Sequence, residues 1–186
     1  MNKGIAVARE TRLLGKVAEG DHAAFRELYE SMSRSIYFYL YRILRDESLA
    51  EDVQVEVFTQ VWKGAGRFRG QSQVKTWIFG IARNLAMNAL RKHRHHANID
   101  DYRDIADDGQ PNPEDADRRR FLQKAMDMLS DKHRDVLDYV FYQQMTYQEI
   151  ADILDISENT VKTRVFYAKA ALRKAIGKLG VKRDEI

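Results

Sequence analysis

The sequence predicts an all-α fold in which two small helical domains are joined by a flexible acidic linker. Over most of the 186 residues, apolar side chains recur every three or four positions, which is the spacing of one helix face. No run alternates between apolar and polar residues in the way that a half-buried strand does. The only prolines, Pro111 and Pro113, lie in DDGQPNPED, where the helical periodicity stops. This segment therefore indicates a linker between two helical modules.

Charge also divides the chain. Residues 97–117 hold eight acidic residues and one basic residue, whereas 21–96 hold twelve basic and eight acidic, and 118–186 hold fourteen and ten. This asymmetry indicates that the modules contact a polyanion, although a tether that is merely solvated fits the linker equally well. We expect five segments: an N-terminal extension with the start of the first helix (1–20), a first domain (21–96), the linker (97–117), a second domain (118–180) and a tail (181–186).

Composition excludes several classes of protein. The chain has no Cys, which removes disulfide frameworks, thiolate zinc sites and cysteine nucleophiles. Its longest purely apolar or aromatic run, residues 36–41, is six residues long. A membrane-spanning helix needs about 20. A signal peptide, a phosphate-cradling Gly-rich loop and a GxSxG motif are also missing. We therefore expect a cytoplasmic protein with no direct membrane insertion, no enzyme activity and no cofactor.

Three helices are predicted for the first module, over residues 23–44, 49–63 and 74–93, with a turn at 45–48. The first should bury Phe25, Leu28, Met32, Ile36, Leu40 and Ile43. The second should bury Val53, Val57, Phe58, Val61 and Trp62. The third should bury Val74, Ile78, Ile81, Leu85 and Ala89. Glycines 64, 66 and 70 separate the second helix from the third.

The second module is predicted to end in a helix-turn-helix. Thr146 and Glu149 have capping-box spacing, so a short helix begins there and ends near Leu154. Asp155 suits a tight turn because Asp tolerates the left-handed conformation, and Ser157 caps the next helix. That helix should bury Val161, Val165, Ala168 and Leu172. The small residue Ala151 of the preceding short helix should lie where the two helices cross. Two earlier helices should bury Phe121, Ala125, Met128 and Leu129, and Val136, Leu137, Val140 and Phe141.

The last helix presents a face that suits the DNA major groove. Its polar, basic and aromatic residues are Asn159, Thr160, Lys162, Thr163, Phe166, Tyr167 and Arg173. Asn binds adenine in a bidentate manner, a Thr methyl contacts a thymine methyl, and Lys or Arg binds guanine or phosphate. The second helix of a helix-turn-helix lies in this groove. A plain helical hairpin with a solvated face is the alternative interpretation.

The first module carries two further candidate surfaces. On one helix, Asp52, Glu56, Thr59 and Lys63 lie opposite the apolar side, and two carboxylates four residues apart mildly destabilise a helix. A basic partner would relieve that repulsion, although such a stripe is often only solvated. The loop and helix that follow combine basic side chains with rings, which suits single-stranded nucleic acid. Trp77 and Phe79 are the ring candidates there, and the edge position of Trp77 fits a core role equally well.

In their order and spacing, residues 25–44, 50–62, 68–94 and 146–176 together resemble an extracytoplasmic-function (ECF) sigma factor of the sigma-70 family. The resemblance covers about Asp21 to Leu179. It implies an alternative sigma factor that binds bacterial RNA polymerase core and directs promoter-specific initiation. It also implies docking on the polymerase β′ clamp helices through Asp52, Glu56, Phe58 and Trp62. One departure concerns this docking helix: family members commonly have Gln immediately before the Glu, and here Val55 precedes Glu56.

The resemblance implies roles for the other surfaces too. The helix-turn-helix would bind the minus-thirty-five promoter element and contact the polymerase β-flap, and the acidic linker would run toward the RNA exit path. The loop and third helix would melt the minus-ten element and capture an unstacked base. An anti-sigma factor would hold both modules away from polymerase until a signal arrives. The residues expected at the minus-ten element are Phe68, Arg69, Gly70, Lys75, Trp77, Arg83, Asn84 and Arg91.

Two other functions fit parts of the sequence. A stand-alone helix-turn-helix regulator explains residues 118–186 but not the acidic face and the basic, aromatic loop of the first module. A metal centre at His93, His95 and His96 lacks a carboxylate at metalloprotease spacing. We therefore expect no metal site.

Overall fold

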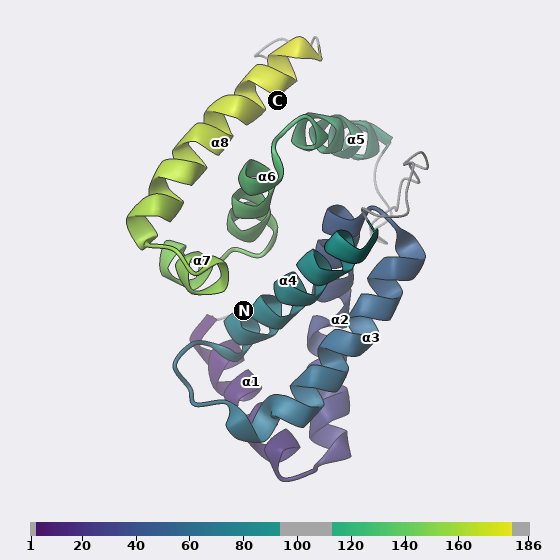
Figure 1. The fold of residues 1–186 in the computed structure, drawn as a ribbon, viewed down its shortest axis with the longest axis vertical. Coiled ribbons are helices and arrows are strands. Elements are labelled where there is room, and N and C mark those ends of the chain that lie inside the picture. The colour runs from purple at the N-terminus through teal and green to yellow at the C-terminus, as the bar shows by residue number, and fades with distance from the viewer. Residues whose placement is uncertain (1–2, 94–112, 180–186) are drawn as a thin grey trace. The chain divides into compact units, whose positions relative to one another are not determined.

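The computed structural model describes residues 3–93 and 113–179, in which every regular element is helical (Figure 1). The helices are α1 (Lys3–Ala18), α2 (His22–Leu44), α3 (Glu47–Gly64), α4 (Val74–His93), α5 (Pro113–Asp127), α6 (Asp131–Leu137), α7 (Tyr147–Leu154) and α8 (Glu158–Lys178). A 3-10 turn, Ala65–Arg67, follows α3, and a π-helical turn, Asp138–Tyr142, follows α6. The all-α prediction is confirmed. The chain forms two compact units, with α1 to α4 and residues 148–155 in the first and α5, α6 and α8 in the second.

Local capping sets the ends of α2 and α3. The Asp21 carboxylate accepts hydrogen bonds from the backbone N–H groups of Ala24 (3.0 Å) and Ala23 (2.8 Å), and this holds the pKa of Asp21 below its ordinary value. Arg45 ends α2 in the left-handed conformation, with φ of 56°. Asp46 then caps α3 through the N–H of Leu49 at 2.9 Å. The turn is therefore shorter than the predicted one at 45–48, and α3 begins at Glu47.

The core of the first unit is built around α2. This helix packs against α1, α3 and α4. Its fully buried side chains include Leu28, Ile36 and Leu40, as predicted, and Tyr39, which is not predicted. Helix α3 contributes Val57 and Val61 to this core, and α4 contributes Ile78, Phe79 and Ala82. The arrangement leaves the outward faces of α3 and α4 available for charged residues.

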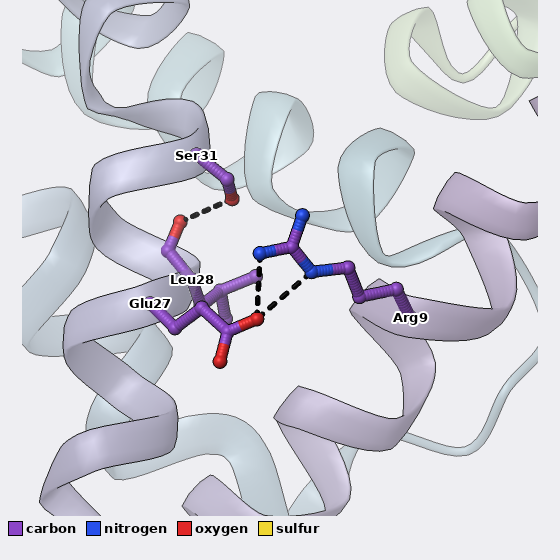
Figure 2. Close-up of polar contacts among 4 residues, drawn as sticks. All are labelled: Arg9, Glu27, Leu28 and Ser31. Carbon is purple, nitrogen blue, oxygen red and sulfur yellow. Dashed lines mark hydrogen bonds and ion pairs between the residues drawn. The ribbon is translucent and has the colours of Figure 1, made fainter. Parts of the chain in front are cut away.

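Helix α1 is a separate helix in the structure, and the sequence does not predict it as one. Residues 1–20 are predicted as an extension with the start of the first helix, whereas the structure has a complete helix that packs on α2 and α4. Leu13, Leu14 and Val17 are almost fully buried. Figure 2 shows the polar link to α2: Arg9 Nε donates to Glu27 Oε1 at 2.8 Å and Nη2 lies 2.6 Å from it.

The same view shows Ser31 Oγ donating to the carbonyl oxygen of Leu28 within α2, at 2.7 Å. That bond is local to α2 and does not connect α1. The Arg9 and Glu27 side chains are 51% and 43% exposed. Because exposed ion pairs contribute less than about 1 kcal/mol, apolar burial is the main attachment of α1.

The second unit packs α5 and α6 against α8. Two residues predicted in its core are exposed, Met128 (49%) and Phe141 (54%). Helix α5 ends at Asp127, so Met128 lies in the turn that follows. The wider π-helical turn rotates the face after α6, so that Tyr139 is fully buried and Phe141 lies under Lys169 Nζ, 5.6 Å from its ring centre. Leu172 of α8 is also predicted as core and is half-buried. The same holds for Ile81 of α4 in the first unit.

We predict that Leu14→Ala lowers the free energy of unfolding by about 2 to 5 kcal/mol, because it leaves a cavity beneath α1. The matched change Arg9→Ala should cost less than about 1 kcal/mol, since it removes an exposed ion pair. Urea denaturation followed by circular dichroism measures both. Equal losses in the two variants would show that the ion pair, not apolar burial, attaches α1.

Candidate nucleic-acid interface

The turn between α7 and α8 has the geometry that the sequence predicts. Helix α7 ends at Leu154, and Asp155 adopts the left-handed conformation with φ of 52°. Ser157 Oγ then accepts a hydrogen bond from the N–H of Thr160 at 3.1 Å and caps α8. These predictions are confirmed. The chain thus passes from α7 to α8 through three residues, 155–157, rather than through a long loop.

Helix α8 has one buried and one exposed face. Val161, Val165 and Ala168 are buried as predicted. The exposed side chains include all seven predicted groove residues: Asn159, Thr160, Lys162, Thr163, Phe166, Tyr167 and Arg173. Phe166 is 69% exposed and Tyr167 58%, with their rings edge to face at 5.5 Å. Neighbouring exposed rings of this size mark a candidate contact surface.

A shallow depression lies on this face, between α6 and α8. Its lining residues are His133, Asn159, Thr160, Thr163, Arg164 and Tyr167. Neither His133 nor Arg164 is among the groove residues predicted from the sequence. Position 164 lies one residue before the core position Val165, so a helical projection gives no clear face for it. His133 joins the site only through the packing of α6 on α8, which the sequence pattern does not encode.

The acidic stripe of α3 is exposed, but one predicted contact residue is not. Asp52, Glu56, Thr59 and Lys63 all lie on the surface. Phe58 is 3% exposed and packs edge-on against Tyr29, with the ring centres 4.7 Å apart. Phe58 is thus a core side chain in this structure, and the docking contact expected for it stays a prediction.

Neighbouring positions of α3 bear on the docking role expected for this helix. Trp62 is half-buried and stacks on the ring of His22 at 4.7 Å. Val55 is 68% exposed. Gln54 turns inward instead, and its Nε2 donates to the carbonyl oxygen of Ser33 at 2.6 Å. Gln54 therefore does not replace a surface Gln at position 55.

The loop before α4 places two rings together. Phe68 and Trp77 lie with their ring centres 5.2 Å apart and their planes at 49°. Both are half-buried, and Gly70 supplies a left-handed turn with φ of 68°. By contrast, Phe79 is fully buried beneath Lys75, so it is not a ring candidate for base stacking. The partly accessible ring pair is therefore Phe68 of the loop with Trp77 of α4.

Basic and polar side chains border this ring pair along α4. Arg69, Asn84 and Arg91 are exposed, and Lys75 and Arg83 are half-buried. The Asn88 side-chain oxygen accepts a hydrogen bond from Arg91. The structure therefore leaves each predicted minus-ten residue partly or fully accessible. Arg94 lies outside the described residues.

Helix α1 contributes an acidic group to the start of α4. Burial raises the pKa of Glu10, while the charge of Lys75 and a hydrogen bond from the Lys75 backbone N–H partly oppose that rise. The carboxylate thus occupies the N-terminal turn of α4, where free N–H groups favour an acceptor. This contact attaches α1 next to the loop that holds Phe68.

Within residues 3–93 and 113–179, no group of three His, Asp or Glu side chains could hold a metal ion. His95 and His96 and most of the acidic linker lie outside the described residues, as does the side chain of His93. No described helix is long and apolar enough to span a membrane.

Comparisons with known proteins identify the family. The sequence model described as Sigma-70 region 2 matches residues 28–96, and that of Sigma-70, region 4 matches residues 125–174. The chain is 30% identical over 175 residues to the ECF RNA polymerase sigma factor SigW of Bacillus subtilis, covering 87% of this chain and 93% of that one. It is 29% identical to SigL of Mycobacterium tuberculosis, covering 89% and 96%. The chain therefore belongs to the ECF sigma factors of the sigma-70 family.

Solved structures share the fold. The structure of CnrH in complex with the cytosolic domain of CnrY aligns with a TM-score of 0.71 at 18% identity, over 91% of this chain and 98% of that one. The sigma factor RpoE of Bartonella quintana, in complex with the anti-sigma factor NepR, aligns with a TM-score of 0.69 at 21% identity, over 82% and 96%. The region 4 match includes α7 and most of α8 in one continuous segment. The predicted function, an alternative sigma factor, is confirmed.

We predict that Glu10→Gln gains stability relative to the wild type as pH rises. Because the folded-state pKa of Glu10 is raised, its contribution to stability is complete below the unfolded-state pKa and is lost as pH rises through the folded-state value. Glutamine avoids this loss and still offers an oxygen to the Lys75 N–H. Urea denaturation at several pH values between acid and neutral tests the trend, with Glu19→Gln as an exposed control. A constant difference at all pH values would contradict it.

Proposed function

We propose that this ECF sigma factor divides promoter recognition between three surfaces. Helix α8 binds the minus-thirty-five element, the Phe68–Trp77 loop captures a base of the minus-ten element, and the outward stripe of α3 docks on the polymerase β′ clamp helices. The observation that supports this most strongly is the exposure of all seven candidate groove residues on α8, opposite a continuous buried seam. Each surface has chemistry that suits its assigned partner.

The chemistry of α8 supports reading of duplex DNA. Asn159 and Thr163 supply an amide and a hydroxyl with a methyl group at the N-terminal half of the helix, which is the part that meets base edges. Phe166 and Tyr167 supply apolar contact, and thymine methyl groups are suitable partners for it. Lys162 forms an ion pair with Glu158 at 3.0 Å, so its ammonium group must exchange partners before it binds DNA. A base contact of this kind discriminates by about 1 to 3 kcal/mol.

The chemistry of the loop supports capture of a single strand. Phe68 and Trp77 form a half-buried ring pair, and Arg69, the residue after Phe68, is exposed. A base that stacks on an aromatic ring recovers about 1 to 3 kcal/mol, which offsets the few kcal/mol needed to unstack it from the duplex. Lys75, Arg83 and Arg91 add positive charge for the strand's phosphates.

The α3 stripe supports docking on a basic protein surface. Asp52 and Glu56 are exposed, and a complementary positive surface would relieve their mutual repulsion. Trp62 is half-buried at the end of the stripe, and Val55 adds an apolar contact within it. We assign a β-flap contact to the second domain by the same family resemblance. The domain limits remain 21–96 and 118–180 in this proposal, with α1 added to the first.

Regulation by an anti-sigma factor is the last part of the proposal. The neighbour RpoE was solved in complex with the anti-sigma factor NepR. An anti-sigma factor that covers the α3 stripe or the rings of α8 would block polymerase or DNA. A cytoplasmic location accords with this function. A stand-alone helix-turn-helix regulator would instead fail to bind polymerase core.

We predict that two pairs of substitutions separate the functions. Asn159→Ala with Lys162→Ala should weaken binding to minus-thirty-five duplex and leave core association unchanged, since both residues lie on α8. Asp52→Ala with Glu56→Ala should weaken core association and leave duplex binding unchanged. Fluorescence anisotropy with labelled duplex and with labelled core polymerase measures both. Equal loss of both activities in both variants would refute the assignment.

We also predict that Val55→Gln raises affinity for core polymerase, because it restores the polar residue that family members commonly carry next to the docking Glu. The side chain is 68% exposed, so stability should stay within about 0.5 kcal/mol of the wild type. Gln60→Ala, on an exposed position of the same helix, is the control for substitution as such. Lower core affinity for Val55→Gln would indicate that docking here uses an apolar contact at this position.

A further inference from the structure

We propose that the depression between α6 and α8 binds one backbone phosphate of duplex DNA, through Arg164 and His133. The proposal rests on the assignment of α8 to the minus-thirty-five element and adds a phosphate site to it. The lining residues are His133, Asn159, Thr160, Thr163, Arg164 and Tyr167, which are all neutral or basic. Such a lining favours an anion and offers no carboxylate to compete with it.

The environment of Arg164 favours a bound anion. Its side chain is half-buried, and the described residues provide it with neither an ion pair nor a side-chain hydrogen bond. A partly desolvated guanidinium without an acidic partner costs free energy, which a bound anion offsets. Its planar donors match phosphate oxygens in a bidentate manner. Lys162, the neighbouring cation, is instead paired with Glu158 at 3.0 Å. Arg164 is therefore the cation available to a phosphate at this point of α8.

His133 supplies a donor from a second helix. It lies in the first turn of α6, which packs against α8. A neutral imidazole keeps one N–H, which donates to a phosphate oxygen. The hydroxyl groups of Thr163 and Tyr167 also line the depression and offer further hydrogen bonds. The Thr160 hydroxyl is already within 2.8 Å of Ser157 Oγ and is less available.

Donors on two helices fix position more tightly than donors on one. Val136 and Leu137 hold α6 in the core, so His133 has a fixed place relative to the buried seam of α8. A phosphate bound by both helices would set the depth and rotation of α8 in the groove. Phosphate contacts of this kind position a protein on DNA, while Asn159 and Thr163 read the bases. His133 and Arg164 thus position α8 on the DNA and do not themselves read the bases.

The test is a double-mutant cycle between side chains and single phosphates. The full chain, alone and bound to polymerase core, is titrated with a duplex that carries the minus-thirty-five element of a promoter it uses. Each phosphate in turn is replaced by an uncharged methylphosphonate. Arg164→Gln should lower affinity about tenfold and reduce the slope of log affinity against log salt by about one. Replacement of one particular phosphate by a methylphosphonate should abolish most of the difference in DNA affinity between Arg164→Gln and the wild type.

The same methylphosphonate should reduce the effect of His133→Gln, because both side chains bind one phosphate. Lys169→Gln is the matched control: it removes an exposed cation of α8 that lies over Phe141, away from the depression. Thermal unfolding checks that each variant is folded. If Arg164→Gln is unstable, Arg164→Lys and His133→Gln complete the cycle.

Two results would overturn the proposal in distinguishable ways. If no methylphosphonate couples to Arg164 or His133 while Asn159→Ala still weakens binding, the phosphate site is wrong and the role of α8 stands. If neither Asn159→Ala nor Arg164→Gln weakens binding, α8 is not the DNA-binding face and both proposals fail.

Discussion

The packing of α2 against α1, α3 and α4 is the interaction on which the first unit depends. Its buried seam, with Leu28, Ile36 and Leu40 fully enclosed, determines which sides of the other helices face inward. The opposite sides then carry the acidic stripe of α3 and the basic edge of α4. Opposite charges are thereby presented on different surfaces of one small core, which is what docking on a basic protein surface and binding of a nucleic-acid strand each require.

In the second unit, burial of one face likewise determines which side chains of a single helix are exposed. Helix α8 buries Val161, Val165 and Ala168 and exposes rings and polar groups on the other side. Its start is fixed by the left-handed Asp155 and the Ser157 cap, so the face of the first turns is set relative to the core. The phosphate site proposed at Arg164 uses the boundary between the two faces, where a side chain is neither free in solvent nor enclosed.

Helical periodicity predicts the bounds of α4 and the seven exposed residues of α8 because both depend on local spacing alone. It fails where tertiary packing decides. Phe79 is a large ring outside the core stripe predicted for its helix, and the neighbouring helices bury it fully. Phe58 is buried as periodicity predicts, whereas the family resemblance assigns it to a docking surface. Phe141 is exposed because the π-helical turn changes the angle per residue. His133 and Arg164 meet only when α6 packs on α8, so no sequence pattern could bring them together.

The proposed function requires both units of this chain to direct polymerase to specific promoters. Run-off transcription with purified bacterial core polymerase, with and without the protein, on a library of upstream DNA from its own genome tests this most directly. The account predicts discrete start sites that depend on the protein and share two spaced sequence elements upstream. Binding to core without any specific start site would contradict it, and binding to duplex DNA alone would favour a stand-alone regulator.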